Sequence, residues 1–132
     1  MDAEGTIVGY GKKVKVTNKQ ATLTICEVMA GRWVFVGDNR GSFHIYDWKL
    51  LSHVKTFSEH QGPVLAIKID EETKSVYFTG SDSKVCMVRL VNEEWKLGQH
   101  IRGQSHDILS LERLGRYLIS GGLTTDLCFY QL

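Results

Sequence analysis

The sequence predicts an all-β protein built from repeated antiparallel sheets of about four strands each. Three observations lead to this prediction. Short runs of β-branched and aromatic residues alternate with turns, and the 132 residues include 13 glycines against one proline. No segment keeps apolar residues at helical spacing over three turns. The chain also repeats itself with a period of 42 residues.

The repeat consists of a glycine-containing turn that leads into a short apolar strand. It occurs three times, at 37–47, 80–89 and 121–131. We align the turns on Gly37, Gly80 and Gly121. The strand residues that fall at equivalent places, 42 residues apart, are Phe43, Val85 and Leu127. An apolar run precedes each turn, so every unit contains a β-hairpin.

Each unit is expected to contain its strands in a fixed order. The first strands are apolar runs near 21–26, 64–69 and 108–111. The second strands end at the glycine turns, near 32–36, 75–79 and 116–120. The third strands begin after those turns, near 42–46, 84–89 and 126–131. The fourth strands lie near 52–57 and 95–101, and further strand material lies at 6–8 and 14–16. Most strands read apolar almost throughout, which is expected when each sheet is stacked between two others.

These units define one partial domain over 1–132. It comprises an incomplete N-terminal unit at 1–17 and repeats at about 18–57, 58–101 and 102–132. A period of about 42 residues with four short strands is typical of one blade of a β-propeller. Three units are fewer than the four to eight blades of a closed propeller. We therefore expect a propeller fragment whose remaining blades come from a longer chain or from self-association.

Four further residues lead to a family. His60 and His106 each stand before the first strand of a unit, and Tyr46-Asp47 stands where a Trp-Asp dipeptide would close the third strand. With its period, the chain resembles the WD40-repeat family, although Val88-Arg89 and Tyr130-Gln131 replace that dipeptide in the other units. The resemblance implies structural roles for the positions quoted: His60, His106, Tyr46, Asp47, Gly37, Gly80 and Gly121. Each histidine would hold its loop to the turn before the third strand.

A closer resemblance rests on the segments 70–80, 105–108 and 118–127, together with Trp95. They are similar to the cirhin family, the WD-repeat subunits of the UtpA (t-UTP) part of the small-subunit processome. This resemblance implies a scaffold in the nucleolus or nucleus that supports pre-rRNA transcription and 18S rRNA maturation. Its partners would be other WD-repeat and helical subunits of a ribosome-assembly complex, with weak or indirect pre-rRNA contact.

Composition excludes several other classes. Lys and Arg total 16 against 15 for Asp and Glu, so the net charge of +1 excludes a globally basic nucleic-acid binder. No stretch approaches the roughly 20 apolar residues of a membrane helix, so no membrane partner is expected. Nothing near the first residues resembles a signal peptide. Cys26, Cys86 and Cys128 form no C-x-x-C pair, which favours a reducing compartment.

Candidate sites are few, and none predicts catalysis, a cofactor or a metal. Lys12, Lys13 and Lys15 would contact RNA phosphates or protect a strand edge. Trp48 and Trp95 each begin a Trp-Lys-Leu tripeptide, and we place both at blade rims as candidate partner contacts. The acidic runs at 70–72 and 93–94 are expected to be solvated hairpin tips.

The sequence thus favours a non-catalytic protein-interaction scaffold. Two alternatives stay open. One is a WD40 adaptor of another complex, such as a ubiquitin ligase, for which a cytoplasmic location would fit. The other is a truncated fragment with no function of its own. A propeller enzyme would need a polar cluster that converges on the central channel, and the strand entries show no repeated set of that kind.

Overall fold

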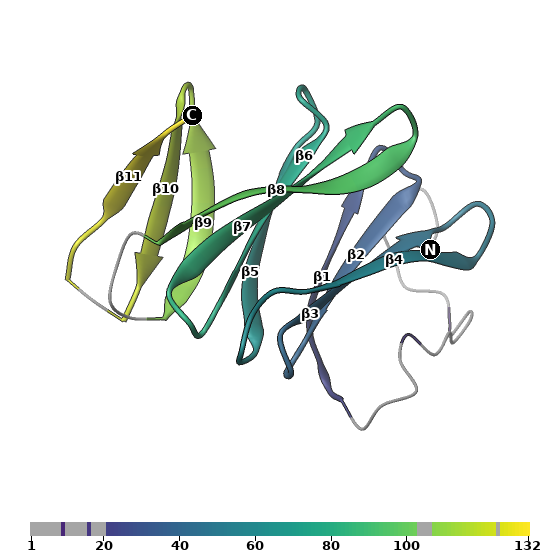
Figure 1. Ribbon diagram of the computed structural model, residues 1–132, viewed down its shortest axis with the longest axis horizontal. Helices are drawn as coiled ribbons and strands as arrows, with labels where there is room; N and C mark the ends of the chain where they lie inside the picture. Colours follow the sequence, from purple (N-terminus) through teal and green to yellow (C-terminus); the bar gives the residue numbers. More distant parts are fainter. Residues whose placement is uncertain (1–8, 10–15, 17–20, 103–106, 124) are drawn as a thin grey trace.

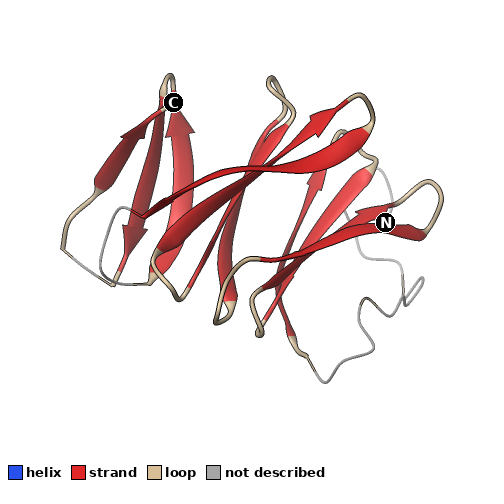
Figure 2. Ribbon diagram, viewed as in Figure 1, coloured by secondary structure: helices blue, strands red, loops and turns tan. Residues whose placement is uncertain are grey.

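Three antiparallel sheets stand side by side in the chain (Figure 1). The computed structural model describes residues 9, 16, 21–102, 107–123 and 125–132. Over these residues all the regular structure is strand (Figure 2). This confirms the predicted all-β fold. None of the described segments is a helix long and apolar enough to cross a membrane.

Each sheet is a meander in which consecutive strands pair. Sheet 1 contains β1 (Leu23–Met29), β2 (Trp33–Asp38), β3 (Ser42–Asp47) and β4 (Ser52–Ser58). Sheet 2 contains β5 (Val64–Asp70), β6 (Ser75–Gly80), β7 (Lys84–Val91) and β8 (Glu94–Arg102). Sheet 3 contains β9 (Ile108–Leu114), β10 (Tyr117–Gly122) and β11 (Cys128–Gln131). The first strands of the sheets, β1, β5 and β9, are neighbours along one edge of the stack.

Local sequence explains the tight hairpins. Ala30 and Gly31, between β1 and β2, have φ of 54° and 62°. Asn92 and Glu93, between β7 and β8, have φ of 51° and 62°. Two successive residues with positive φ form the turn whose twist matches that of paired strands. Glycine and asparagine adopt this conformation most readily, so the short loops fix the pairing of their strands.

Strand pairing confirms the period of 42 residues and corrects one detail of the alignment. Phe43 pairs with Gly37, and Val85 pairs with Thr79. The residue equivalent to Gly37 is therefore Thr79, and Gly80 stands one position later. An alignment of the turns by their glycines matches Gly80 with Gly37, whereas the hydrogen-bonded register matches Thr79 with Gly37.

Two apolar clusters hold the sheets together. Between sheets 1 and 2, the rings of Phe43 and Phe78 stack with centroids 4.2 Å apart. In the same cluster Trp95 meets Trp33 and Phe35 edge-on, at 5.6 Å and 5.3 Å. A smaller cluster joins sheets 2 and 3, with its buried residues at Ala66, Tyr77, Val85, Ile108, Leu111, Leu118 and Tyr130.

The placement of Trp95 at a blade rim is wrong. Its side chain is only 1% exposed, because Trp95, the second residue of β8, packs in the cluster between the first two sheets. Trp48 follows β3 in a turn and is 56% exposed, so it keeps its place as a candidate contact. Lys12, Lys13, Lys15 and His106 lie outside the described residues, as does the strand expected at 6–8.

We predict that Trp95→Ala lowers the free energy of unfolding by about 3–5 kcal/mol, because it leaves a large cavity between two sheets. Chemical denaturation at low protein concentration measures this loss. Trp48→Ala removes the same side chain from an exposed turn and serves as the control, with an expected change within about 0.5 kcal/mol. Equal losses in the two variants would contradict the packing described above.

Candidate functional site

His60 lies in the connection between β4 and β5, where sheet 1 passes to sheet 2. Its side chain is buried, and its Nδ1 lies 2.6 Å from Oδ1 of Asp82 in the β6–β7 turn. The backbone N–H of Gln61 donates to the other oxygen of Asp82 at 3.3 Å. The structure thus places His60 against the turn before the third strand of sheet 2.

Two glycines, Gly41 and Gly80, leave room for His60 to lie against sheets 1 and 2. The backbone N–H of His60 donates to the carbonyl of Gly41, whose φ is 90°. A Cβ at Gly41 would overlap the carbonyl carbon of His60. A Cβ at Gly80 would lie 2.7 Å from the ring of His60. Gly41 belongs to sheet 1 and Gly80 to sheet 2, so His60 is held between turns of both sheets.

A second polar network lies in sheet 1. Nε2 of the buried His44 is 2.9 Å from Oδ2 of Asp38, and its Nδ1 is 2.9 Å from Oγ1 of Thr56. Nε2 of His53 is 2.7 Å from the same hydroxyl. The other oxygen of Asp38 accepts the backbone N–H groups of Arg40 and Ser42 at 2.9 Å. Asp38 therefore fixes both the β2–β3 turn and the orientation of the His44 ring.

Both turn aspartates are held in the ionised form. Burial opposes ionisation of Asp38, but the bonds from His44 and from backbone N–H groups lower its pKa below the ordinary value. Burial likewise opposes ionisation of Asp82, and the bond and charge of His60 lower its pKa. Both carboxylates therefore act as acceptors near neutral pH.

Tyr46 and Asp47, the residues at the Trp-Asp position, end β3. Asp47 is 2% exposed and accepts the backbone N–H groups of Lys49 and Leu50. Its second oxygen accepts Nε of Arg32 at 3.1 Å. These contacts close the β3–β4 turn and link it to the β1–β2 turn. Asp47 is thus placed as a structural residue.

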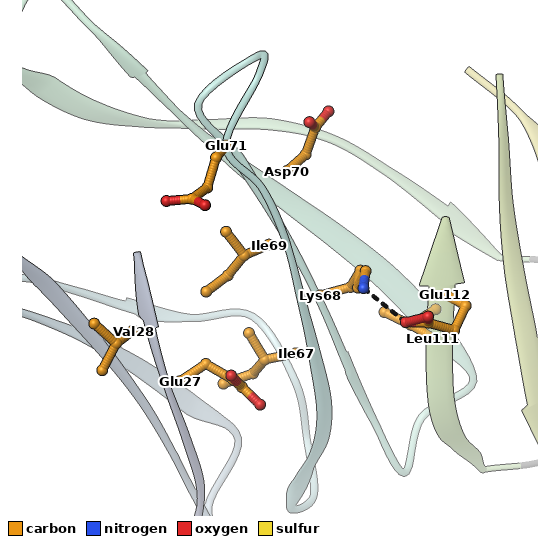
Figure 3. A pocket seen from close by; sticks show the side chains of 9 residues that line it. All are labelled: Glu27, Val28, Ile67, Lys68, Ile69, Asp70, Glu71, Leu111 and Glu112. Carbon is orange, nitrogen blue, oxygen red and sulfur yellow. Dashed lines mark hydrogen bonds and ion pairs between the residues drawn. The ribbon is translucent and has the colours of Figure 1, made fainter. Parts of the chain in front are cut away.

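The structure also contains a hollow of about 480 Å³ along the edge formed by β1, β5 and β9 (Figure 3). Four carboxylates and one lysine line it: Glu27, Asp70, Glu71, Glu112 and Lys68. Its apolar lining is Val28, Ile67, Ile69 and Leu111. The excess of carboxylates gives this hollow a negative potential, which attracts a cationic group.

Three of the four carboxylates are held by contacts that link neighbouring sheets. Glu112 pairs with Lys68 at 2.6 Å, which joins sheet 3 to sheet 2. Asp70 is buried and pairs with Arg113 of sheet 3. Glu71 accepts the backbone N–H of Ala30 in sheet 1 at 2.9 Å. Asp70 is therefore not the solvated hairpin tip that the sequence predicted, because its strand brings it against Arg113.

Glu27 differs from the other three carboxylates. It is exposed, and within the described part of the chain it has no ion-pair partner. It lies on β1, facing the side of β5 that carries Ile67 and Ile69, whereas Lys68 points toward Glu112 of β9. A cationic partner group would meet this carboxylate without first breaking an ion pair.

Sequence reasoning missed Asp38, Asp82 and the hollow. Asp82 lies 22 residues after His60, and Asp38 lies six residues before His44. An aspartate in the turn between the second and third strands was the signal that could have found both. The hollow carried no such signal, because its residues are distributed over three repeats.

His44, Cys86 and Cys128 occupy equivalent positions, but they lie on three different sheets. Among the described residues no group of three or more His, Cys, Asp or Glu side chains could hold a metal ion.

Comparisons by sequence give no match, either among protein-family profiles or among curated proteins. Comparison with solved structures gives several. A chain of the mitotic checkpoint complex superposes with a TM-score of 0.76 at 17% identity, covering 87% of this chain and 35% of that one. The computationally designed Ika4 protein gives 0.73 at 13% identity, over 86% of this chain and 68% of that one. The designed Ika8 protein gives 0.73 at 13% identity, over 86% and 34%.

These similarities establish the fold. The chain has the architecture of part of a WD40-type β-propeller, with sheets 1, 2 and 3 as its blades. It spans about a third of the matched chain in the mitotic checkpoint complex.

Acid is expected to weaken the fold through the turn aspartates. A lowered folded-state pKa stabilises the protein above the unfolded value of about 3.9, and this stability is lost as the pH falls through the folded-state pKa. Urea denaturation at pH 7 and at lower pH should show a smaller loss in a double variant, Asp38→Asn with Asp82→Asn, than in the unchanged protein. Glu72→Gln, at an exposed turn, is the control. An unchanged acid sensitivity in the double variant would contradict this role.

The cysteines should differ in reactivity. Burial raises the pKa of the Cys86 thiol to about 12, whereas Cys26 is exposed. Because the thiolate is the reactive form, iodoacetamide at pH 8 should label Cys26 first and Cys86 only on unfolding. Mass spectrometry of timed digests measures the order. Early labelling of Cys86 in the folded protein would show that sheets 1 and 2 separate readily.

Proposed function

We propose that the chain is a non-catalytic interaction module that binds a protein partner through the acidic hollow between β1, β5 and β9. The observation that supports it most is the exposed Glu27 beside carboxylates already positioned by contacts between sheets. A partner that inserts a lysine or arginine would meet fixed negative charge and an apolar floor of Ile67 and Ile69.

The proposal extends to the kind of complex. The similarity of 105–127 to the cirhin family favours a scaffold of ribosome assembly, with UtpA-type subunits as partners and a nucleolar location. A WD40 scaffold needs no catalytic group, since its blades present surfaces while their sheets supply rigidity. Pre-rRNA contact would then come mainly through these partners, because the chain carries a net charge of only +1.

A tagged purification from the native cells tests both parts. We expect UtpA-type subunits together with U3 or 5′ pre-rRNA. We further expect Glu27→Lys to reduce the recovered partner at least about tenfold, because it replaces an unpaired carboxylate with a like charge for a cationic partner. Glu72→Lys makes the same charge change at an exposed turn outside the hollow and should leave recovery unchanged.

Other outcomes separate the alternatives. Ubiquitin-ligase or trafficking subunits would overturn the ribosome-assembly assignment while leaving an interaction module. Chaperones and degradation factors alone would indicate a fragment without its own function. Equal losses from Glu27→Lys and Glu72→Lys would overturn the hollow as the binding site.

A further inference from the structure

The packing of one sheet on the next occurs twice in this chain and uses equivalent positions. One side of each junction is formed by Phe35, Phe43 and Ile45 in sheet 1, and by Tyr77, Val85 and Met87 in sheet 2. The opposite side of each junction is formed by Val76, Phe78 and Val88 in sheet 2, and by Leu118, Ser120 and Tyr130 in sheet 3. Sheet 2 carries both sides, one on each of its faces.

Sheet 3 carries a third set of residues equivalent to Tyr77, Val85 and Met87 of sheet 2, and no sheet packs on this set in the described structure. Its residues at the equivalent positions are Ile119, Leu127 and Phe129, each 42 residues after its counterpart in sheet 2. Leu127 is 66% exposed and Phe129 is 58% exposed. The ring of Tyr117 meets that of Phe129 edge-on at 6.3 Å, which continues the apolar surface along the sheet. Apolar groups at these positions are covered in both internal junctions.

The outward face of sheet 1, which points away from sheet 2, carries a third set of residues equivalent to the opposite side of the junction. The equivalents of Val76, Phe78 and Val88 are Val34, Val36 and Tyr46. An apolar hollow of about 160 Å³ lies over these three residues, and Val28 beside them is 57% exposed. Val16 also lines this hollow, and the Tyr46 hydroxyl donates to its carbonyl at 3.4 Å. A docking sheet must therefore share this face with Val16 or displace it.

We propose that sheet 3 of one copy docks on sheet 1 of a second copy, head to tail. The chain carries both halves of a junction that it already forms twice, so a second copy is the occupant that fits the two faces on which the described structure packs no sheet. Such an interface is heterologous: it gives a closed ring when the rotation closes and an open chain when it does not. Two copies would place six sheets in one ring, within the range of known propellers.

Sedimentation of the whole 132-residue chain over a range of concentrations tests this assembly. We expect self-association, and we expect Phe129→Glu and Val28→Glu each to raise the dissociation constant at least about tenfold, because each places a charge in an apolar junction. Leu50→Glu, at a turn residue 72% exposed, is the control and should not change it. Circular dichroism of the dilute variants checks that each one is folded.

Mixing the two face variants decides the geometry. A Phe129→Glu copy keeps an intact sheet 1, and a Val28→Glu copy keeps an intact sheet 3. Head-to-tail docking therefore predicts a 1:1 complex from the mixture, limited to two copies. A chain that stays monomeric at every concentration overturns the proposal. So does a Val28→Glu variant that associates as the unchanged protein does, because sheet 3 would then pack on sheet 3.

Discussion

The buried contact of His60 with two sheets is the constraint on which the stack depends. Apolar packing between sheets is not directional, and by itself it does not select one alignment of a sheet on the next. His60 supplies that direction. Its backbone lies against Gly41 of sheet 1, and its ring lies against Gly80 and Asp82 of sheet 2. One residue thus fixes two turns that belong to different sheets.

At the edge of the stack formed by β1, β5 and β9, the same polar contacts align neighbouring sheets and position the carboxylates of the hollow. The contacts of Lys68 with Glu112 and of Glu71 with Ala30 join neighbouring sheets where β1, β5 and β9 lie together. Exposed ion pairs of this kind contribute little to stability, with a median of roughly 0–1 kcal/mol. Their larger effect is on geometry, because they hold carboxylates in fixed positions around the hollow. An interaction surface needs such positioned charges more than it needs additional stability.

Much of the fold could be predicted because its main signal is periodic. The sequence alone shows the spacing of 42 residues between Phe43 and Val85, and the strand pairing places both residues at the same position of their sheets. Trp95 shows the limit of local patterns. The same tripeptide begins at Trp48 and Trp95, yet Trp48 lies in a turn and Trp95 is the second residue of a strand. The family resemblance predicted that His60 would hold its loop to the turn before the third strand, but it did not identify Asp82 as the partner, because aspartate is common in turns for local reasons. Only the assembled sheets bring these two residues together.

The linear order of the sheets also shapes how the molecule unfolds. Among the described residues the main contacts between sheets join neighbouring sheets, so the local stability of a sheet is set by its own strands and by the junctions that it shares. Sheet 2 is enclosed on both faces by the two apolar clusters, whereas the described part of sheet 3 has three strands and one junction. Cooperativity is therefore graded along the chain. Amide hydrogens of β6 are expected to exchange only with global opening, and those of β10 through a local opening of the third sheet.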